Sequence, residues 1–185
     1  MTKTLNDLRD EAYEIALEHG FHDEERCHAH SLMLIITELS EAVEADRKNR
    51  HTDYNLLDQA KAEGIIFEDF FPTLIKDTFE DELADAAIRC LDFCGLHNID
   101  LSDVNEAVTT EGGTDGFLEE EWGVTESVFF ATSVLSSANH PELKVKSALF
   151  LIFALADKYR VDLFGHIDVK MAYNANRPFM HGKKY

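Results

Sequence analysis

Basic residues are scarce in this chain of 185 residues: 17 lysines and arginines stand against 36 aspartates and glutamates, and the formal net charge is −19. A nucleic-acid duplex or an anionic membrane surface binds proteins through clustered Lys and Arg. The charge balance therefore argues against a nucleic-acid duplex and against a membrane as partners. A small anion stays compatible with this charge if it arrives together with a metal ion.

Proline and cysteine are rare as well, with three residues each. So few prolines, in a chain that is 45% hydrophobic, argue against disorder over most of its length. The cysteines are odd in number, and Cys90 and Cys94 stand one helical turn apart, which suits packing better than a disulfide framework. We expect all three cysteines to be reduced residues of the core rather than metal ligands.

Long apolar runs are absent too. No segment approaches the ~18 consecutive apolar residues of a membrane-spanning helix, and residues 1–7 lack the apolar core of a signal peptide. We therefore expect a cytoplasmic protein. Its length fits a single domain over residues 1–185 and is sufficient to bury a hydrophobic core.

Apolar residues recur with helical spacing along nearly the whole chain, and no strand alternation, internal repeat or low-complexity segment stands out. The pattern predicts an all-α fold, a helical bundle. We expect a short turn or helix at 98–105 and a glycine-rich acidic loop at 109–123. Longer helices are expected at about 5–19, 23–49, 56–62, 77–95, 125–137 and 141–159, with a last helix that runs up to Pro178.

Two apolar segments exceed what one small bundle would be expected to bury. Residues 149–155 are apolar on every side of a helix, which indicates a helix that is buried all round or shared with another subunit. Phe67, Phe70 and Phe71 form an aromatic cluster, for which packing in a core or dimer interface is favoured over base stacking. Both segments point to self-association.

The most informative feature is two pairs of carboxylates. Glu38 and Glu41 stand three residues apart in one predicted helix, and Glu82 and Asp85 stand three apart in a later one. Residues three apart lie on nearly the same helix face, and apolar residues surround both pairs. Four carboxylates directed toward an interior require compensation, which a shared Mg²⁺ or Mn²⁺ ion would supply.

Other interpretations of these acids are less favoured. A solvated acidic helix face is the common origin of a single such pair, but two pairs on apolar faces argue against it. A di-iron centre would need Glu-x-x-His on two helices, and only Glu25 and His28 fit that spacing.

The C-terminal segment is basic in an otherwise acidic chain. From Arg160 onward, five Lys or Arg residues stand against two Asp. On a helix up to Pro178, one face would carry four polar residues, namely Lys170, Tyr173, Asn174 and Arg177. That face suits a phosphorylated ligand, although a solubilising end of the chain would have a similar charge.

Taken together, three motifs resemble those of the MazG-like, all-α nucleoside triphosphate pyrophosphohydrolases. They are Thr37-Glu38-Leu39-Ser40-Glu41, then Glu82-Leu83-Ala84-Asp85, then Lys170…Asn174-Ala175-Asn176-Arg177-Pro178…His181-Gly182-Lys183. The chain departs from the family in two ways. Thr37 stands where the family often has a further acid, which bears on a second metal ion, and the gap between the acid pairs is long. The resemblance thus implies a MazG-like domain with insertions at about 51–76 and 106–140.

The resemblance implies cleavage of a (d)NTP to the (d)NMP and pyrophosphate by attack of water at the α-phosphorus. It implies Mg²⁺, or Mn²⁺ as a substitute, and a homodimer or homotetramer. The metal ligands would be Glu38, Glu41, Glu82 and Asp85, with Glu38 as either a ligand or the catalytic base. The substrate would be bound by Lys170, Tyr173, Asn174, Arg177 and Lys183.

A non-enzymatic function is the alternative. In an acidic helical binding or regulatory protein, the carboxylate pairs would be surface charge and the basic tail would dock a partner. Base and sugar preference, the number of metal ions and the biological role stay open at this point.

Overall fold

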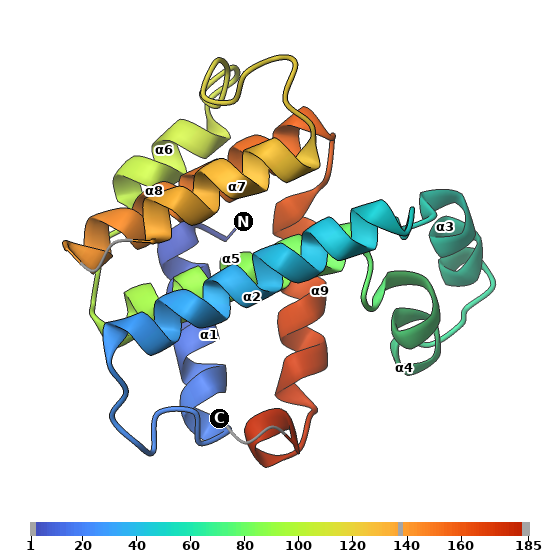
Figure 1. The fold of residues 1–185 in the computed structure, drawn as a ribbon. Coiled ribbons are helices and arrows are strands. Elements are labelled where there is room, and N and C mark those ends of the chain that lie inside the picture. The colour runs from blue at the N-terminus through green and yellow to red at the C-terminus, as the bar shows by residue number, and fades with distance from the viewer. Residues whose placement is uncertain (1–2, 137–138, 183–185) are drawn as a thin grey trace.

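The computed structural model describes residues 3–136 and 139–182, and these residues form helices and no strand (Figure 1). The expected all-α fold class is confirmed for this part of the chain. The α-helices are α1 (Leu5–Glu18), α2 (His28–Arg47), α3 (Tyr54–Ala62), α4 (Phe67–Phe70), α5 (Phe79–Leu96), α6 (Ser102–Thr109), α7 (Val124–Leu135), α8 (Pro141–Lys158) and α9 (Leu163–Ala175). A π-helical turn over Phe71–Ile75 follows α4, and a 3-10 turn over Phe179–Gly182 follows α9.

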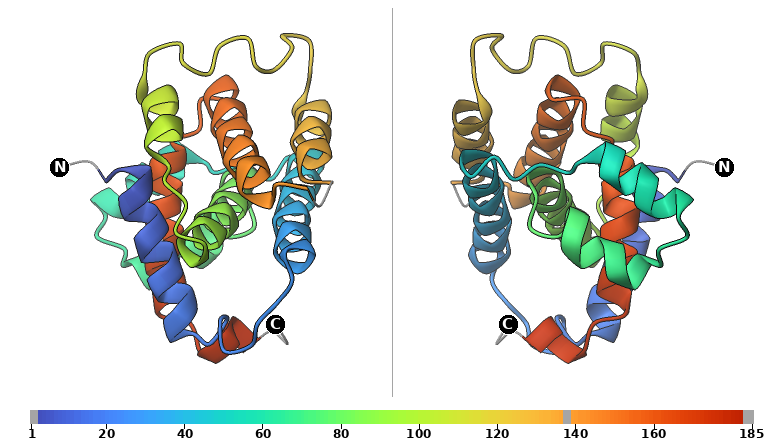
Figure 2. Two further views of the ribbon diagram at one scale, coloured as in Figure 1. Left: turned by 90° about the vertical axis from the view of Figure 1, so that its left-hand side faces the viewer. Right: turned by 90° about the vertical axis from the view of Figure 1, so that its right-hand side faces the viewer.

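Helix α5 lies at the centre of the molecule, and residues on most of its sides are buried. The helices α1, α2, α8 and α9 all pack against it. Figure 2 shows α1 and α9 on one side of α5 and α2 on the other. The buried hydrophobic residues of these helices form one continuous core.

Local signals in the sequence set several helix ends. Thr4 begins α1 with a capping box, in which Thr4 and Asp7 exchange hydrogen bonds between side chain and backbone. Gly20 follows the end of α1 with φ +80°, a conformation that only glycine adopts readily. Thr78 caps α5 by accepting a hydrogen bond from the backbone N–H of Asp81.

Three helices have boundaries that differ from the expected ones by three residues or more, and one of them is α6, which spans Ser102–Thr109 rather than 98–105. Helix α2 begins at His28 rather than near residue 23, because residues 21–27 form turns after Gly20. Helix α9 ends at Ala175 rather than at Pro178. Proline disfavours a helical conformation in the residue before it, so the helix ends ahead of this position.

The segment 51–76 forms an arm that projects from the bundle and carries α3 and α4 (Figure 1). Its small hydrophobic cluster contains Leu57, Phe71 and Ile75, and Val169 and Tyr173 of α9 pack against it. Phe67 and Phe70 are partly buried in the same cluster. The packing interpretation of these aromatic residues is therefore confirmed.

Burial bears on two other expectations. Nearly all of the 149–155 segment is buried inside this one chain, with Phe150 partly buried, which confirms the alternative of a helix buried all round, so the segment gives no support for self-association. Cys90 and Cys94 are free and buried, as expected, but Cys27 is exposed. Cys27 lies directly before α2 in a mostly exposed stretch of the chain, and this position explains the difference. Among the described residues, no helix has the length and apolar character needed to cross a membrane.

The crossing of α1 and α5 depends on a glycine. A Cβ atom at Gly95 would lie 2.5 Å from the Cβ of Tyr13 and 3.0 Å from the carbonyl oxygen of Arg9. We expect Gly95→Ala to lower the free energy of unfolding by about 1–3 kcal/mol in urea denaturation, because the helices must separate. Gly123→Ala is the control, since its Cβ would approach only the movable carboxylate of Glu126, at 3.2 Å. Equal losses in the two variants would contradict the close crossing.

Candidate metal centre

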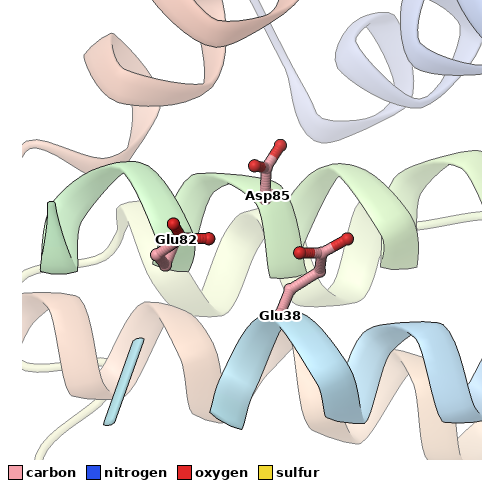
Figure 3. Close-up of side chains that lie close together, drawn as sticks. All are labelled: Glu38, Glu82 and Asp85. Carbon is pink, nitrogen blue, oxygen red and sulfur yellow. The ribbon is translucent and has the colours of Figure 1, made fainter. Parts of the chain in front are cut away.

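Helices α2 and α5 bring three of the four predicted metal ligands together. Glu38 of α2, and Glu82 and Asp85 of α5, each offer a carboxylate oxygen, and these oxygens lie within 4.8 Å of one another. Figure 3 shows Glu38 reaching from α2 toward the two acids of α5. Glu38 and Glu82 are buried, and Asp85 is partly buried.

The acids occupy this position because they belong to the buried faces of their helices. Glu38 lies among the buried residues of α2, between Ile35 and Leu39 in sequence. Glu82 follows the capped start of α5, where Phe79 and Leu83 are fully buried. The packing of α2 on α5 buries these apolar faces and carries the carboxylates inward with them.

The fourth predicted ligand, Glu41, lies at the edge of this cluster. Three residues turn an α-helix by about 300°, so Glu41 is displaced from Glu38 by about 60°. Glu41 is exposed and is not one of the three grouped acids. Its negative charge nevertheless helps to raise the pKa of Glu82, so it is close enough to act on the cluster.

The cluster is short of positive charge around Glu82. Burial, and after it the negative charge of Asp85, raise the pKa of Glu82 to about 8, although Lys170 opposes both. A carboxyl group with this pKa is largely protonated at neutral pH. A bound divalent cation would compensate the charge and release the proton.

Lys170 lies beside the cluster and forms ion pairs with two acids. Its Nζ atom is 2.7 Å from Asp81 Oδ2 and 2.7 Å from Asp85 Oδ2. Burial opposes the charge of Lys170, but Asp85 and Asp81 outweigh it and raise the lysine pKa. Burial also raises the pKa of Asp81, to about 6, although Lys170 opposes that shift. In this structure, the predicted phosphate ligand Lys170 therefore neutralises carboxylates.

Arg89 is a second cation at the cluster. Its Nε atom donates a hydrogen bond to Glu38 Oε1 at 3.1 Å, and its guanidinium lies 5.8 Å from the ring centre of Phe21. The sequence interpretation missed Arg89 and also Asp81. Arg89 is four residues after Asp85 and therefore shares its helix face, a signal that the sequence contained.

The other predicted substrate-binding residues of the C-terminal segment do not all lie at one site. Asn174 and Arg177 line a cavity of about 50 Å³, together with Glu38, Asp85 and Arg89. Tyr173 is not among its lining residues but stacks on Phe71 with the ring centres 4.3 Å apart. Lys183 lies outside the described residues.

A larger cavity of about 380 Å³ shares three lining residues with the small one, namely Phe21, Arg89 and Asp92. It lies along α2 and α5, and several of its walls are aromatic or imidazole rings, among them His28, Phe93 and His97. The ring centres of His28 and His97 are 4.9 Å apart in an edge-to-face arrangement. Glu38 and Asp85 of the acid cluster thus line the small cavity, and the larger cavity adjoins the small one.

Comparison with known proteins gives no match for this chain. No protein-family model matches it, and neither a curated protein nor a solved structure matches it significantly.

The raised pKa of Glu82 predicts how stability depends on pH. Without divalent cations, folded Glu82 keeps its proton up to about pH 8, whereas the unfolded side chain releases it near its ordinary value of 4.5. The folded state binds more protons between these values, so the stability from this proton is lost as the pH rises toward 8. In urea denaturation with EDTA, we expect the free energy of unfolding to fall more steeply with pH in wild type than in Glu82→Gln. Parallel curves would contradict the raised pKa.

The pairing of Lys170 predicts a large stability effect. Lys170→Met removes the cation between Asp81 and Asp85, and breaking a buried ion pair typically costs about 3–5 kcal/mol. Lys3→Met is the control, because this exposed lysine forms surface ion pairs, which contribute about 0–1 kcal/mol. Urea denaturation measures both losses. Added Mn²⁺ should reduce the difference in free energy of unfolding between wild type and Lys170→Met, but not the difference between wild type and Lys3→Met. A loss no larger than that of the control would show that the buried pair adds little.

Proposed function

We propose that this protein is a metal-dependent nucleoside triphosphate pyrophosphohydrolase, which cleaves a (d)NTP to the (d)NMP and pyrophosphate by attack of water at the α-phosphorus. The convergence of Glu38, Glu82 and Asp85 from two helices is the observation that carries the proposal. The resemblance to the MazG-like enzymes supports it, because two of the motifs behind that resemblance supply the three acids.

The donor set of the cluster fits Mg²⁺, with Mn²⁺ as a substitute. All three side chains offer carboxylate oxygens, which both ions favour. Glu38, Glu82 and Asp85 would hold the ion, and Glu41 would join them from its exposed position on α2. When bound, such an ion neutralises charge on phosphate oxygens and lowers the pKa of a coordinated water.

Glu38 has two roles that its position allows. It is either a metal ligand or the base that accepts a proton from the attacking water. The hydrogen bond that Arg89 donates fixes the position of one of the Glu38 oxygens. Both roles require the ionised form.

The cationic and amide side chains at and near the small cavity would bind the triphosphate. Arg177 and Asn174 line this cavity beside Asp85, and Arg89 reaches it from α5. Lys170 would exchange one carboxylate partner for a phosphate oxygen once a metal ion compensates Asp85. Tyr173 and Lys183 are proposed as further substrate-binding residues by resemblance.

The nucleoside would occupy the larger cavity. Its volume of about 380 Å³ falls within the usual range for small-molecule sites, and its rings offer flat apolar surfaces to a base. The shared residues Phe21, Arg89 and Asp92 place it directly beside the small cavity. A homodimer or homotetramer and a cytoplasmic location are also proposed, from the resemblance and from the sequence respectively.

Pyrophosphate release from a panel of ribo- and deoxyribonucleoside triphosphates tests the proposal, with Mg²⁺, Mn²⁺ or EDTA. We expect metal-dependent release that is lost in Glu38→Gln and Asp85→Asn, because both substitutions remove a carboxylate from the cluster. Glu44→Gln is the matched control, since Glu44 lies on α2 in exposed ion pairs with Arg47 and Lys48.

Two results would contradict the enzymatic proposal. One is equal turnover in the two cluster variants and the control. The other is the absence of pyrophosphate release from every triphosphate tested, together with a melting temperature that Mg²⁺ and a non-hydrolysable triphosphate leave unchanged. This second result would favour the acidic binding or regulatory protein.

A further inference from the structure

A second group of carboxylates lies at the start of α5. Asp77, Asp81 and Glu82 each offer an oxygen within 4.8 Å of the others. Glu82 thus belongs to both groups. The field of a helix N-terminus favours acidic residues, but this modest effect does not explain why one of these carboxylates is almost completely buried.

Asp81 is that buried carboxylate, and one of its oxygens has no hydrogen-bond partner in the described part of the chain. Asp81 is 1% exposed. Its Oδ2 atom contacts the Lys170 ammonium at 2.7 Å and accepts a hydrogen bond from the backbone N–H of Asp77 at 3.0 Å. Its Oδ1 atom is buried and has no hydrogen-bond partner among the described residues. Buried polar atoms in folded proteins nearly always have one, so this oxygen indicates a missing ligand.

The other two carboxylates can complete a site. The Glu82 carboxylate forms no hydrogen bond or ion pair with another described residue. The Asp77 side chain is 48% exposed, which leaves a route from solvent. Water or phosphate oxygens can therefore fill the coordination positions that the protein does not supply.

Two cations already contact Asp77. Lys76 Nζ is 2.6 Å from Asp77 Oδ1, and Arg50 Nη2 is 3.7 Å from Asp77 Oδ2. Both cationic side chains are more than a third exposed. Surface ion pairs of this kind are weak, so a divalent ion can displace them.

We propose that Asp77, Asp81 and Glu82 form a second divalent-cation site, with Glu82 shared between it and the first. Mg²⁺ and Mn²⁺ are the ions that this all-oxygen donor set favours. Binding at this site does not depend on the enzymatic reaction. Its use to neutralise a second part of the triphosphate rests on the proposed function.

Counting bound Mn²⁺ tests the site on the full chain without any substrate. Electron paramagnetic resonance of free Mn²⁺ during titration gives the number bound per chain. We expect two ions in wild type and one each in Asp77→Asn, Asp81→Asn and Asp85→Asn. Asp58→Asn, an exposed aspartate of α3, is the control and should keep two.

A further variant should act in the opposite direction. Lys76→Met removes a competing cation from Asp77 and should tighten the second Mn²⁺ severalfold without affecting the first. Asp77→Asn carries the test even if Asp81→Asn fails to fold, because Asp77 is half exposed and asparagine tolerates its φ of +58°. Circular dichroism checks that each variant is folded.

The outcomes separate this proposal from the proposed function. One ion in wild type that survives Asp77→Asn but is lost in Asp85→Asn would overturn the second site and leave the first intact. One ion that is lost in Asp77→Asn but survives Asp85→Asn would support the second site and contradict the first. No bound ion in wild type would overturn both.

Discussion

The buried contacts of Lys170 with Asp81 and Asp85 are the interaction on which the site depends. They join α9 to α5 at the point where the acids converge. Removing a charged group from water is costly, and an ammonium placed between two carboxylates reduces this cost for all three groups. The C-terminal helix is therefore held at the acid cluster by charge as well as by apolar packing.

This arrangement leaves an imbalance that a metal ion would correct. Lys170 and Arg89 each pair with acids of the cluster, but Glu82 has no hydrogen-bond or ion-pair partner among the described residues, and its pKa rises to about 8. An interior of this kind is stable at neutral pH because one carboxyl group keeps its proton. In the proposed function, a divalent ion would replace that proton.

Much of the fold and part of the site could be predicted from the sequence. Apolar periodicity predicted most of the helices to within a few residues, but not α4, and Thr4 and Gly20 marked the ends of α1. The carboxylate spacing identified Glu38, Glu82 and Asp85, which the structure brings together. Arg89 shares a helix face with Asp85, but its hydrogen bond to Glu38 could not be predicted, because Glu38 lies on α2 and only the packing of α2 on α5 brings the two side chains together.

Sequence alone determined which side chains each helix presents on one face, because the helical period fixes their order around the axis. It could not determine which of those side chains become buried, because burial depends on the partner helix. Tertiary packing separated Glu38 from Glu41, directed Lys170 toward two carboxylates and placed Tyr173 against Phe71. The spacing of the acids along each helix is therefore a local property, whereas the raised pKa of Glu82 arises only when α2, α5 and α9 pack together.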